Sequence, residues 1–349
     1  MNHEKNGIIR IDPIGREGAA VRPMKYLVLL LCIFGCCACS SKQITPNKAL
    51  TTEELETLEE LQTPYIGMIL KSLDGEFYPL IKAGAEAEAD RLGAELVVVA
   101  PDSEADADGQ AELVSIMADM ALDVLIISPC DETLLTDSLE RASEKGKHIL
   151  AVDERMSYSG CEGYIGSDDY DGAFHQGAHA ATLAADSSAV ILRGQMGSRN
   201  HVDRTMGLRD SLQRSGIQRI DSYCCNSSRT EAYHKVAELL RLGAPIGVIC
   251  TTDDDMAFGA KKAISESERT IPVVSFDGTP EMLKAVGEGT VDSVMMQDAY
   301  EIGVQSVRAA VQSVDNQPVG EIIVPMKLVV LRTAERELEA LEQRLVNNE

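Results

Sequence analysis

The sequence predicts an α/β protein with two doubly wound lobes, each built on a mostly parallel sheet covered by helices. The first observation is a series of short apolar runs of strand length, separated by segments whose apolar residues recur at helical spacing. The second is that this alternation restarts once along the chain, which indicates two consecutive βαβ series. The third is the length, since 349 residues suit two domains better than one.

The first series contains four apolar runs of strand length, at 65–70, 95–99, 124–127 and 148–152. Polar residues are rare within these runs, which indicates strands buried on both faces, as in a parallel sheet. The segments between them have apolar residues on one helix face, such as Leu80, Ala83, Gly84 and Ala87, then Leu113, Ile116, Met117 and Met120. The first half of the folded part is therefore predicted to be one lobe.

The second series has strand-like runs at 190–192, 246–250 and 273–276. Helical patterns occupy the segments around 205–214, 230–242 and 257–265. A repeated series of this kind predicts a second lobe, with a cleft between the two sheets.

Polar side chains follow many of these runs, at the carboxyl ends of the strands, where doubly wound sheets bind their ligands. They are Lys71, Asp74, Ser128, Asp131, Asp153, Glu154 and Arg155 in the first half, and Asp253, Asp254, Asp255 and Asp277 in the second. Aspartate favours turns and helix caps, so local structure explains any single one of these residues equally well. The whole series is better explained by a cleft in which carboxylates and bases face one ligand.

Composition excludes several kinds of partner. The formal net charge of -24 and the pI of about 4.6 repel phosphate backbones, so no nucleic-acid partner is expected. The cysteines have no histidines at zinc-ligand spacing, and we predict neither a metal nor a cofactor. The adjacent pair Cys224 and Cys225 is interpreted as buried inert thiols, and the sequence leaves open the disulfide state of Cys130, Cys161, Cys224, Cys225 and Cys250.

The amino terminus has the pattern of an export signal. Residues 24–34 read MKYLVLLLCIF, a lysine followed by an apolar run too short to span a bilayer comfortably. A small residue and a cysteine follow, as in a bacterial lipobox, in which the thiol is lipidated. Cys36 fits this pattern best, and Cys39 is the alternative.

These features divide the amino-terminal region. Residues 1–35 are the predicted signal peptide with an upstream extension, so translation starts at Met1 or at Met24. Residues 36–63 are the predicted lipid-anchored tether, because 45–62 is polar and acidic with widely spaced apolar residues. The expected location is extracytoplasmic, anchored by lipid to the periplasmic or outer face of a cell membrane.

Six segments, in order, carry a recognisable pattern: IGMILKSLDGEFYPLIKAGAEAEADRLG, ILAVDERM, YIGSDDYDGA, DRTMGLRDSL, TTDDDMAFGA and VVSFDGTPEMLKAV. Together they resemble the type I periplasmic sugar-binding family, especially its ribose- and allose-binding members, over residues 65–330. The resemblance implies a monomeric solute-binding protein of the periplasmic binding protein type I fold. It would capture a monosaccharide or similar polyol and deliver it to the permease of an ABC importer.

The resemblance also implies a three-segment hinge, on which the two lobes close like jaws. We expect the chain to cross between lobes near Gly166, Gln297 and Val324. The amino-terminal lobe would then contain 64–166 plus about 298–324, and the carboxy-terminal lobe 167–297 plus about 325–349.

Matching the motifs residue by residue implies several ligand contacts. Phe77 and Tyr78 match an aromatic pair that flanks the sugar ring, because an apolar sugar face stacks on a ring while its hydroxyls need hydrogen bonds. Asp153 and Arg155 match an acidic and a basic contact, and Arg204 matches an arginine of the second lobe. The complete predicted set is Lys71, Asp74, Phe77, Tyr78, Ser128, Asp153, Glu154, Arg155, Asp168, Arg204, Asp253, Asp277 and Gln297.

The chain departs from the family pattern at positions that bear on the ligand. It has Gly75-Glu76 where sugar binders of this branch usually have Asn-Pro, and Asp253 where they have Asn. No Trp is present for ring stacking. Either several carboxylates are paired with bases, or the ligand is not a neutral aldose but an amino sugar or another cationic polyol.

Other functions fit less well. An enzyme is not predicted, because the chain has no Gly-x-Ser-x-Gly elbow, no Walker-type phosphate loop and no paired metal motif. A transcriptional repressor with this fold would need an amino-terminal DNA-binding helix pair where the export signal lies. The alternative that stays open is a protein that presents an autoinducer-like or amino-sugar ligand to a chemoreceptor or sensor kinase.

Overall fold

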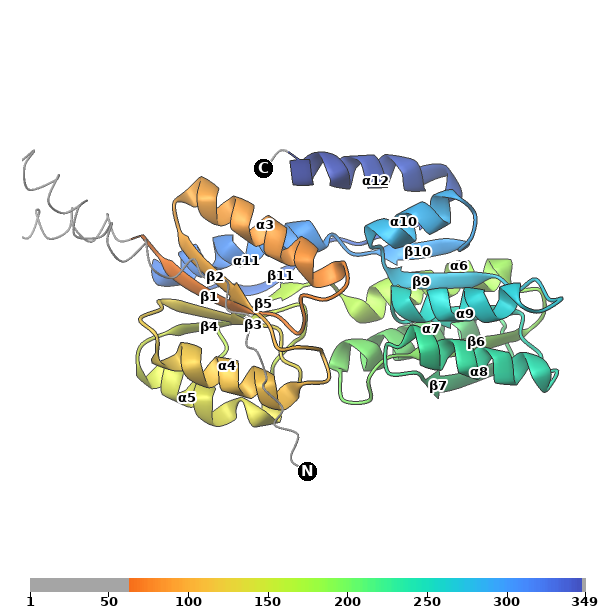
Figure 1. Ribbon diagram of the computed structural model, residues 1–349, viewed down its shortest axis with the longest axis horizontal. Helices are drawn as coiled ribbons and strands as arrows, with labels where there is room; N and C mark the ends of the chain where they lie inside the picture. Colours follow the sequence, from red (N-terminus) through yellow and green to blue (C-terminus); the bar gives the residue numbers. More distant parts are fainter. Residues whose placement is uncertain (1–62, 347–349) are drawn as a thin grey trace, which may run out of the picture. The chain divides into compact units, whose positions relative to one another are not determined.

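Two six-stranded sheets organise residues 63–346, the part of the chain that the structure, a computed structural model, describes (Figure 1). The strand order is β11-β5-β4-β3-β1-β2 in one sheet and β12-β10-β9-β8-β6-β7 in the other. Neighbouring strands are parallel except for β10 and β12, which are antiparallel. The predicted α/β class with two doubly wound lobes is confirmed.

The first lobe contains the strands β1 (Tyr65–Ile69), β2 (Glu95–Val99), β3 (Val124–Ile127), β4 (His148–Val152), β5 (Gly163–Gly166) and β11 (Gly320–Ile323). Its helices are α3 (Phe77–Leu92), α4 (Ala107–Asp119), α5 (Thr136–Glu144) and α11 (Ala299–Val314). Helix α3 packs on α11 over one face of the sheet, and α4 packs beside α5 over the other (Figure 1). Because helices cover both faces, the inner strands are apolar throughout, and every residue of β3 is buried.

The second lobe contains the strands β6 (Ser188–Arg193), β7 (Arg219–Cys224), β8 (Val248–Thr251), β9 (Val273–Asp277), β10 (Ser293–Met296) and β12 (Lys327–Val330). Its helices are α6 (Asp169–Leu183), α7 (Arg199–Arg214), α8 (Arg229–Arg241), α9 (Asp254–Ser265), α10 (Pro280–Gly287) and α12 (Leu331–Val346). Helices α6 and α7 pack together, as do α8 and α9, while α10 packs on α12.

Both sheets are completed by strands that lie far away in the sequence. Strand β11 pairs with β5, so that Gly320 lies opposite Gly163, and β12 pairs with β10. The chain therefore passes between the sheets three times: after β5, after β10, and between β11 and β12.

The packing of α3 on α11 brings their backbones into contact. A Cβ atom at Gly84 would lie 2.0 Å from the Tyr300 carbonyl oxygen, and one at Gly303 would lie 2.0 Å from the Ile81 carbonyl oxygen. Only glycine permits this approach, which holds α3 close to the sheet and so positions the aromatic residues at its amino-terminal end.

The predicted signal peptide, almost all of the tether, and both candidate lipidation sites, Cys36 and Cys39, lie outside the described residues. Within residues 63–346, no helix combines the length and the apolar character that crossing a membrane requires. The five cysteines of this part are free thiols; Cys225 and Cys250 are buried, and Cys130, Cys161 and Cys224 are partly exposed.

Candidate ligand-binding site

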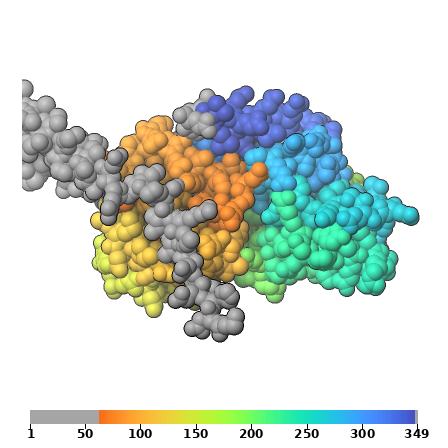
Figure 2. All heavy atoms as spheres, viewed as in Figure 1, coloured from red at the N-terminus to blue at the C-terminus, as the bar shows by residue number. Residues whose placement is uncertain are grey.

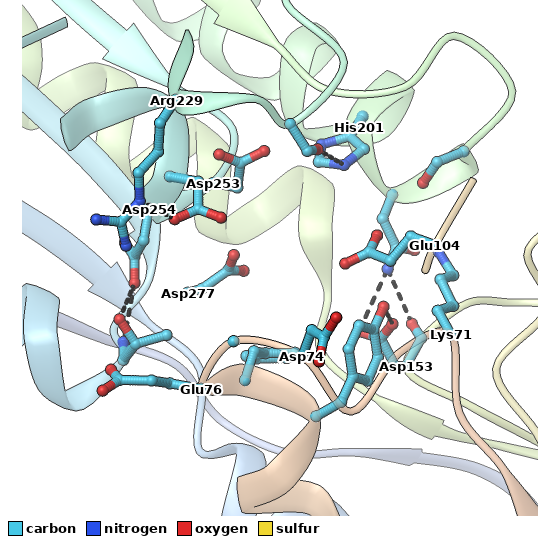
Figure 3. A pocket seen from close by; sticks show the side chains of 18 of the residues that line it. Lys71, Asp74, Glu76, Glu104, Asp153, His201, Arg229, Asp253, Asp254 and Asp277 are labelled. Carbon is cyan, nitrogen blue, oxygen red and sulfur yellow. Dashed lines mark hydrogen bonds and ion pairs between the residues drawn. The ribbon is translucent and has the colours of Figure 1, made fainter. Parts of the chain in front are cut away.

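A cavity of about 180 Å³ lies between the two lobes, where the carboxyl ends of their strands face each other (Figure 3). The first lobe contributes the loop from β1 into α3, the loop after β2 and the end of β4. The second contributes the amino-terminal ends of α7, α8, α9 and α10. The space-filling view shows the start of α3 in contact with the second lobe on this face of the molecule (Figure 2).

Charged side chains dominate the lining. The carboxylates are Asp74, Glu76, Glu104, Asp153, Asp253, Asp254, Asp255, Asp277 and Glu281. The basic side chains are Lys71, Arg204 and Arg229. Eight residues of the predicted contact set line the cavity: Lys71, Asp74, Phe77, Tyr78, Asp153, Arg204, Asp253 and Asp277.

Asp153 lies at the end of β4 in a left-handed backbone conformation, with φ 61°. Its carboxylate accepts hydrogen bonds of 3.1 Å from the hydroxyls of Tyr78 and Ser128, while Tyr164 donates to its carbonyl oxygen at 2.9 Å. Burial raises the pKa of this carboxyl. A strained, buried carboxylate held by several donors is typical of a functional site. Ser128 therefore orients Asp153 and does not itself line the cavity.

The aromatic pair stands beside Asp153. The rings of Phe77 and Tyr78 have centroids 5.3 Å apart and meet edge to face at 82°. Tyr78 is buried and Phe77 partly exposed, so the two rings give this side of the cavity its apolar surface.

Glu154 does not line the cavity. It forms a buried ion pair with Lys71, and it accepts hydrogen bonds from the Ser198 hydroxyl at 2.8 Å and from the Arg199 amide. Burial alone would raise its pKa, but Lys71 and these hydrogen bonds hold the pKa of Glu154 below its usual value. The amino terminus of α7 also favours an anion at this point. Glu154 therefore joins the two lobes.

In the second lobe, Arg204 is buried and held from three sides. Its Nε donates to Asp169 at 2.6 Å, and its Nη1 donates to the Thr252 carbonyl at 2.8 Å and to Asp277 at 2.9 Å. The guanidinium also lies 4.0 Å from the centre of the Phe276 ring.

Gln297 orients Asp277 from behind. Its amide donates to Asp277 at 2.9 Å, and Gln297 itself is buried outside the lining. Asp277 has φ 106°, a left-handed conformation that is unusual for a residue with a side chain. Burial raises the pKa of Asp277 well above its usual value, although Arg204 opposes the rise.

Asp253 and Asp254 begin α9 and differ in how they are bonded. Asp254 accepts from the Ser275 hydroxyl at 2.7 Å, the Gly278 amide at 3.0 Å, and the amide and hydroxyl of Thr279, both at 2.9 Å. Asp253 caps the helix through Oδ1, which accepts from the Met256 amide at 2.9 Å. Its second oxygen, Oδ2, is buried and has no hydrogen-bond partner in the described part of the chain. Burial raises the pKa of Asp253 to about 6 and that of Asp254 to about 7.

Besides Ser128, Glu154 and Gln297, two further predicted contacts lie outside the lining. After Asp153 the chain turns, so that Arg155 donates to Glu321 at 2.6 Å and stacks on the Tyr164 ring at 3.9 Å. Asp168 is exposed and caps α6, where it accepts from the Asp171 amide at 3.0 Å. Both side chains stabilise local structure and do not reach the cavity, where they were predicted to contact the ligand.

Several lining residues were not predicted. Glu104 follows β2 and makes no hydrogen bond or ion pair with the described residues. The rule that polar residues after a strand line the cleft would have found it. His201 is held by Thr252 at 2.9 Å and Ser227 at 3.2 Å, and burial lowers its pKa well below the usual value, so its ring is neutral. Arg229 pairs with Asp255 and Glu281.

Within residues 63–346, no three His, Cys, Asp or Glu side chains are grouped so that they could hold a metal ion. The predicted ligand is organic, and the lining offers both rings and charged hydrogen-bonding groups for one.

This architecture defines a class of protein, in which two lobes close on a small ligand held between them. The family model described as periplasmic binding protein domain matches residues 66–318. The chain belongs to this family, which confirms the resemblance to the type I periplasmic sugar-binding proteins. The family is made of solute-binding proteins.

Two curated relatives extend over most of the chain. The ribose import binding protein of Escherichia coli is 26% identical over 268 residues, which cover 76% of this chain and 90% of the relative. The D-allose-binding periplasmic protein of the same organism is 25% identical over 272 residues, covering 73% of this chain and 85% of the relative.

Solved structures share the fold. An ABC transporter periplasmic solute-binding protein from Actinobacillus succinogenes with bound D-allose has a TM-score of 0.73 at 22% identity, covering 78% of this chain and 100% of that one. A solute-binding protein from Bacillus halodurans with bound myo-inositol has a TM-score of 0.72 at 23% identity, covering 79% and 98%.

Proposed function

We propose that this chain is an extracytoplasmic solute-binding protein that captures a monosaccharide-sized polyol and delivers it to an ABC importer. The observation that carries the proposal is the cavity between the lobes, in which the aromatic pair Phe77 and Tyr78 adjoins the buried carboxylate of Asp153. The names of the relatives, which bind ribose and allose, support a ligand of this class.

The lining suits a ligand made of hydroxyl groups around a compact carbon ring. The apolar face of such a ring packs on the aromatic pair, while its hydroxyls donate to Asp153 and Asp277 and accept from Arg204. Hydrogen bonds to charged groups are stronger than neutral ones, so a few of them hold a small ligand.

Closure of the lobes completes the site in this proposal. The three connections between the sheets act as the hinge, with the amino-terminal lobe formed by 64–166 plus about 298–324. The carboxy-terminal lobe is 167–297 plus about 325–349. Contacts across the cleft, such as the Glu281 amide donating to Glu76 at 2.8 Å, stabilise the closed arrangement.

The amino-terminal region anchors the protein in this proposal. Lipid on Cys36, or alternatively Cys39, holds the chain at the membrane, and 36–63 is the tether. Metabolic labelling with a fatty-acid analogue tests this, because the Cys36→Ser variant loses the label if Cys36 is modified. Cys39→Ser is the matched control, and loss of label only in that variant assigns the lipid to Cys39.

The first experiment is thermal unfolding of the full chain with a panel of pentoses, hexoses, polyols and amino sugars. A ligand at about one hundred times its Kd stabilises the protein by about 2.7 kcal/mol, which raises Tm by several degrees. The shift is expected to disappear in Asp153→Asn and to persist in Asp168→Asn, whose side chain lies outside the cavity. A well-folded sample that no member of the panel stabilises would contradict the proposed function.

A further inference from the structure

The cavity holds more carboxylates than its own bases neutralise. Each lining base already has an acidic partner: Lys71 pairs with Glu154, Arg204 with Asp169 and Asp277, and Arg229 with Asp255 and Glu281. The other lining carboxylates have no basic partner in the described part of the chain; they are Asp74, Glu76, Glu104, Asp153, Asp253 and Asp254. The lining therefore has more acidic than basic groups around a small space, and ionisation of all of them is unfavourable without a further positive charge.

One of these carboxylates has an oxygen without any donor. Asp253 is only 7% exposed, its Oδ1 caps α9, and its Oδ2 is buried without a hydrogen-bond partner among the described residues. The Ser227 hydroxyl lowers the pKa of Asp253 as a hydrogen-bond donor, and it also lies 3.2 Å from Nε2 of His201. A buried carboxylate oxygen without a donor is costly, so a group that donates to it is expected in the functional complex.

Asp253 lines the ligand space. Asp253 and Asp277 of the second lobe, with Asp74 and Asp153 of the first, surround the open centre of the cavity (Figure 3). Burial raises the pKa of Glu104 to about 7, and nearby carboxylates add to this effect. A positive charge placed between these groups would favour their ionised forms, which are otherwise costly to adopt.

The positive charge is better supplied by an organic group than by a metal ion. The carboxylates come from separate loops of both lobes, and residues 63–346 contain no cluster that would hold a metal. The rings of Phe77 and Tyr78 border the same space, and aromatic faces attract ammonium groups as well as sugar rings.

Resting on the proposed function, we infer that the ligand is a polyol with a protonated nitrogen, an amino or imino sugar, whose ammonium group donates to Asp253. The excess of carboxylates selects against neutral sugars, because a neutral ligand leaves the negative charges of the closed cavity uncompensated. The hydroxyl groups of the ligand bind at Asp153, Arg204 and Asp277 as proposed above.

The test is calorimetric titration of the full chain at pH 7.5 with matched pairs of probes. D-glucosamine, D-galactosamine and D-mannosamine are each compared with the parent hexose, and deoxynojirimycin is compared with glucose. At least one amine is expected to bind about tenfold more tightly than its parent or better, since a desolvated charge pair contributes 1.4 kcal/mol or more. In Asp253→Asn this preference should fall by about tenfold, and in the control Asp168→Asn it should not change.

The outcomes separate the two proposals. A neutral hexose that binds as tightly as its amine overturns the inference and leaves the proposed function standing. A folded protein that binds no member of the panel overturns the proposed function itself. Stabilisation by calcium or magnesium ions alone, lost in Asp253→Asn, would show a metal site instead. If Asp253→Asn does not fold, Glu104→Gln serves as the second variant, because Glu104 makes no hydrogen bond to the described residues.

Discussion

The carboxylate of Glu154, in the first lobe, accepts a hydrogen bond of 2.8 Å from the hydroxyl of Ser198, in the second. The same carboxylate is paired with Lys71, so one acidic side chain joins the ion pair of one lobe to the helix terminus of the other. We therefore interpret Glu154 as a contact that stabilises the closed cleft, since the protein itself provides the partners of this carboxylate.

Removing the charge of Glu154 is expected to destabilise the protein. Glu154→Gln leaves Lys71 buried without a counter-ion, and breaking a buried pair in this way costs about 3–5 kcal/mol. The double variant Lys71→Met with Glu154→Gln should recover much of this loss, because no buried charge is left over. Chemical unfolding of the four proteins measures the coupling, and simple additivity of the two single effects would exclude it.

Glu104 makes stability depend on pH. Burial raises the pKa of Glu104 in the folded protein to about 7, above its ordinary value of 4.5, so its contribution to stability is greatest below about pH 4.5 and is lost as the pH rises through 7. Glu104→Gln removes this loss, and the variant should gain roughly 1–2 kcal/mol over the native chain between pH 5 and pH 8. Denaturation midpoints at pH 5, 6.5 and 8 measure the difference, which would stay constant if Glu104 were not buried beside other acids.

We predict that no other basic residue can replace Arg204. Lysine keeps the charge but cannot reach Asp169, Asp277 and the Thr252 carbonyl together, and it loses the stacking on Phe276. Arg204→Lys should lower Tm and weaken ligand binding by about tenfold or more, since one buried charged hydrogen bond contributes about 1.5–3 kcal/mol.

The matched control for this variant is Arg209→Lys, on the exposed side of the same helix. It should leave both Tm and affinity unchanged. Equal effects of the two substitutions, measured by thermal unfolding and calorimetry, would show that helix propensity and not the site is responsible.

The backbone contact between α3 and α11 predicts a large effect of a single methyl group. Gly84→Ala would place its Cβ against the Tyr300 carbonyl and push the helices apart, which is expected to cost about 1–3 kcal/mol. Gly197→Ala, where a Cβ meets nothing within 4 Å, is the control and should be nearly neutral. Urea unfolding compares them, and a Gly84→Ala protein as stable as the control would mean that the helices move apart at little cost.

The strands with long apolar runs were predictable from the sequence. The bounds of β2, β3 and β4 agree with the predicted ranges, because helices cover both faces of the sheet and favour apolar residues in its strands. The expected burial on both faces is wrong for β2, which is the edge strand and is only partly buried. The strands β5, β7, β10, β11 and β12 were not identified. Four of these are only four residues long, and β7 mixes polar and apolar residues, so local pattern does not distinguish them from loops.

The sequence by itself determined the class of fold and placed the site at the carboxyl ends of the strands. Lys71, Asp153, Asp253 and Asp277 were found because the ends of parallel strands lie at one edge of a sheet. Only the tertiary structure decided which charged side chains line the ligand cavity and which are paired with other parts of the protein. Glu154 and Arg155 are neighbours in the chain, yet one contacts α7 and the other Glu321 of β11. Ion pairs depend on distances between atoms of separate elements, and those distances are set by the packing of the two lobes.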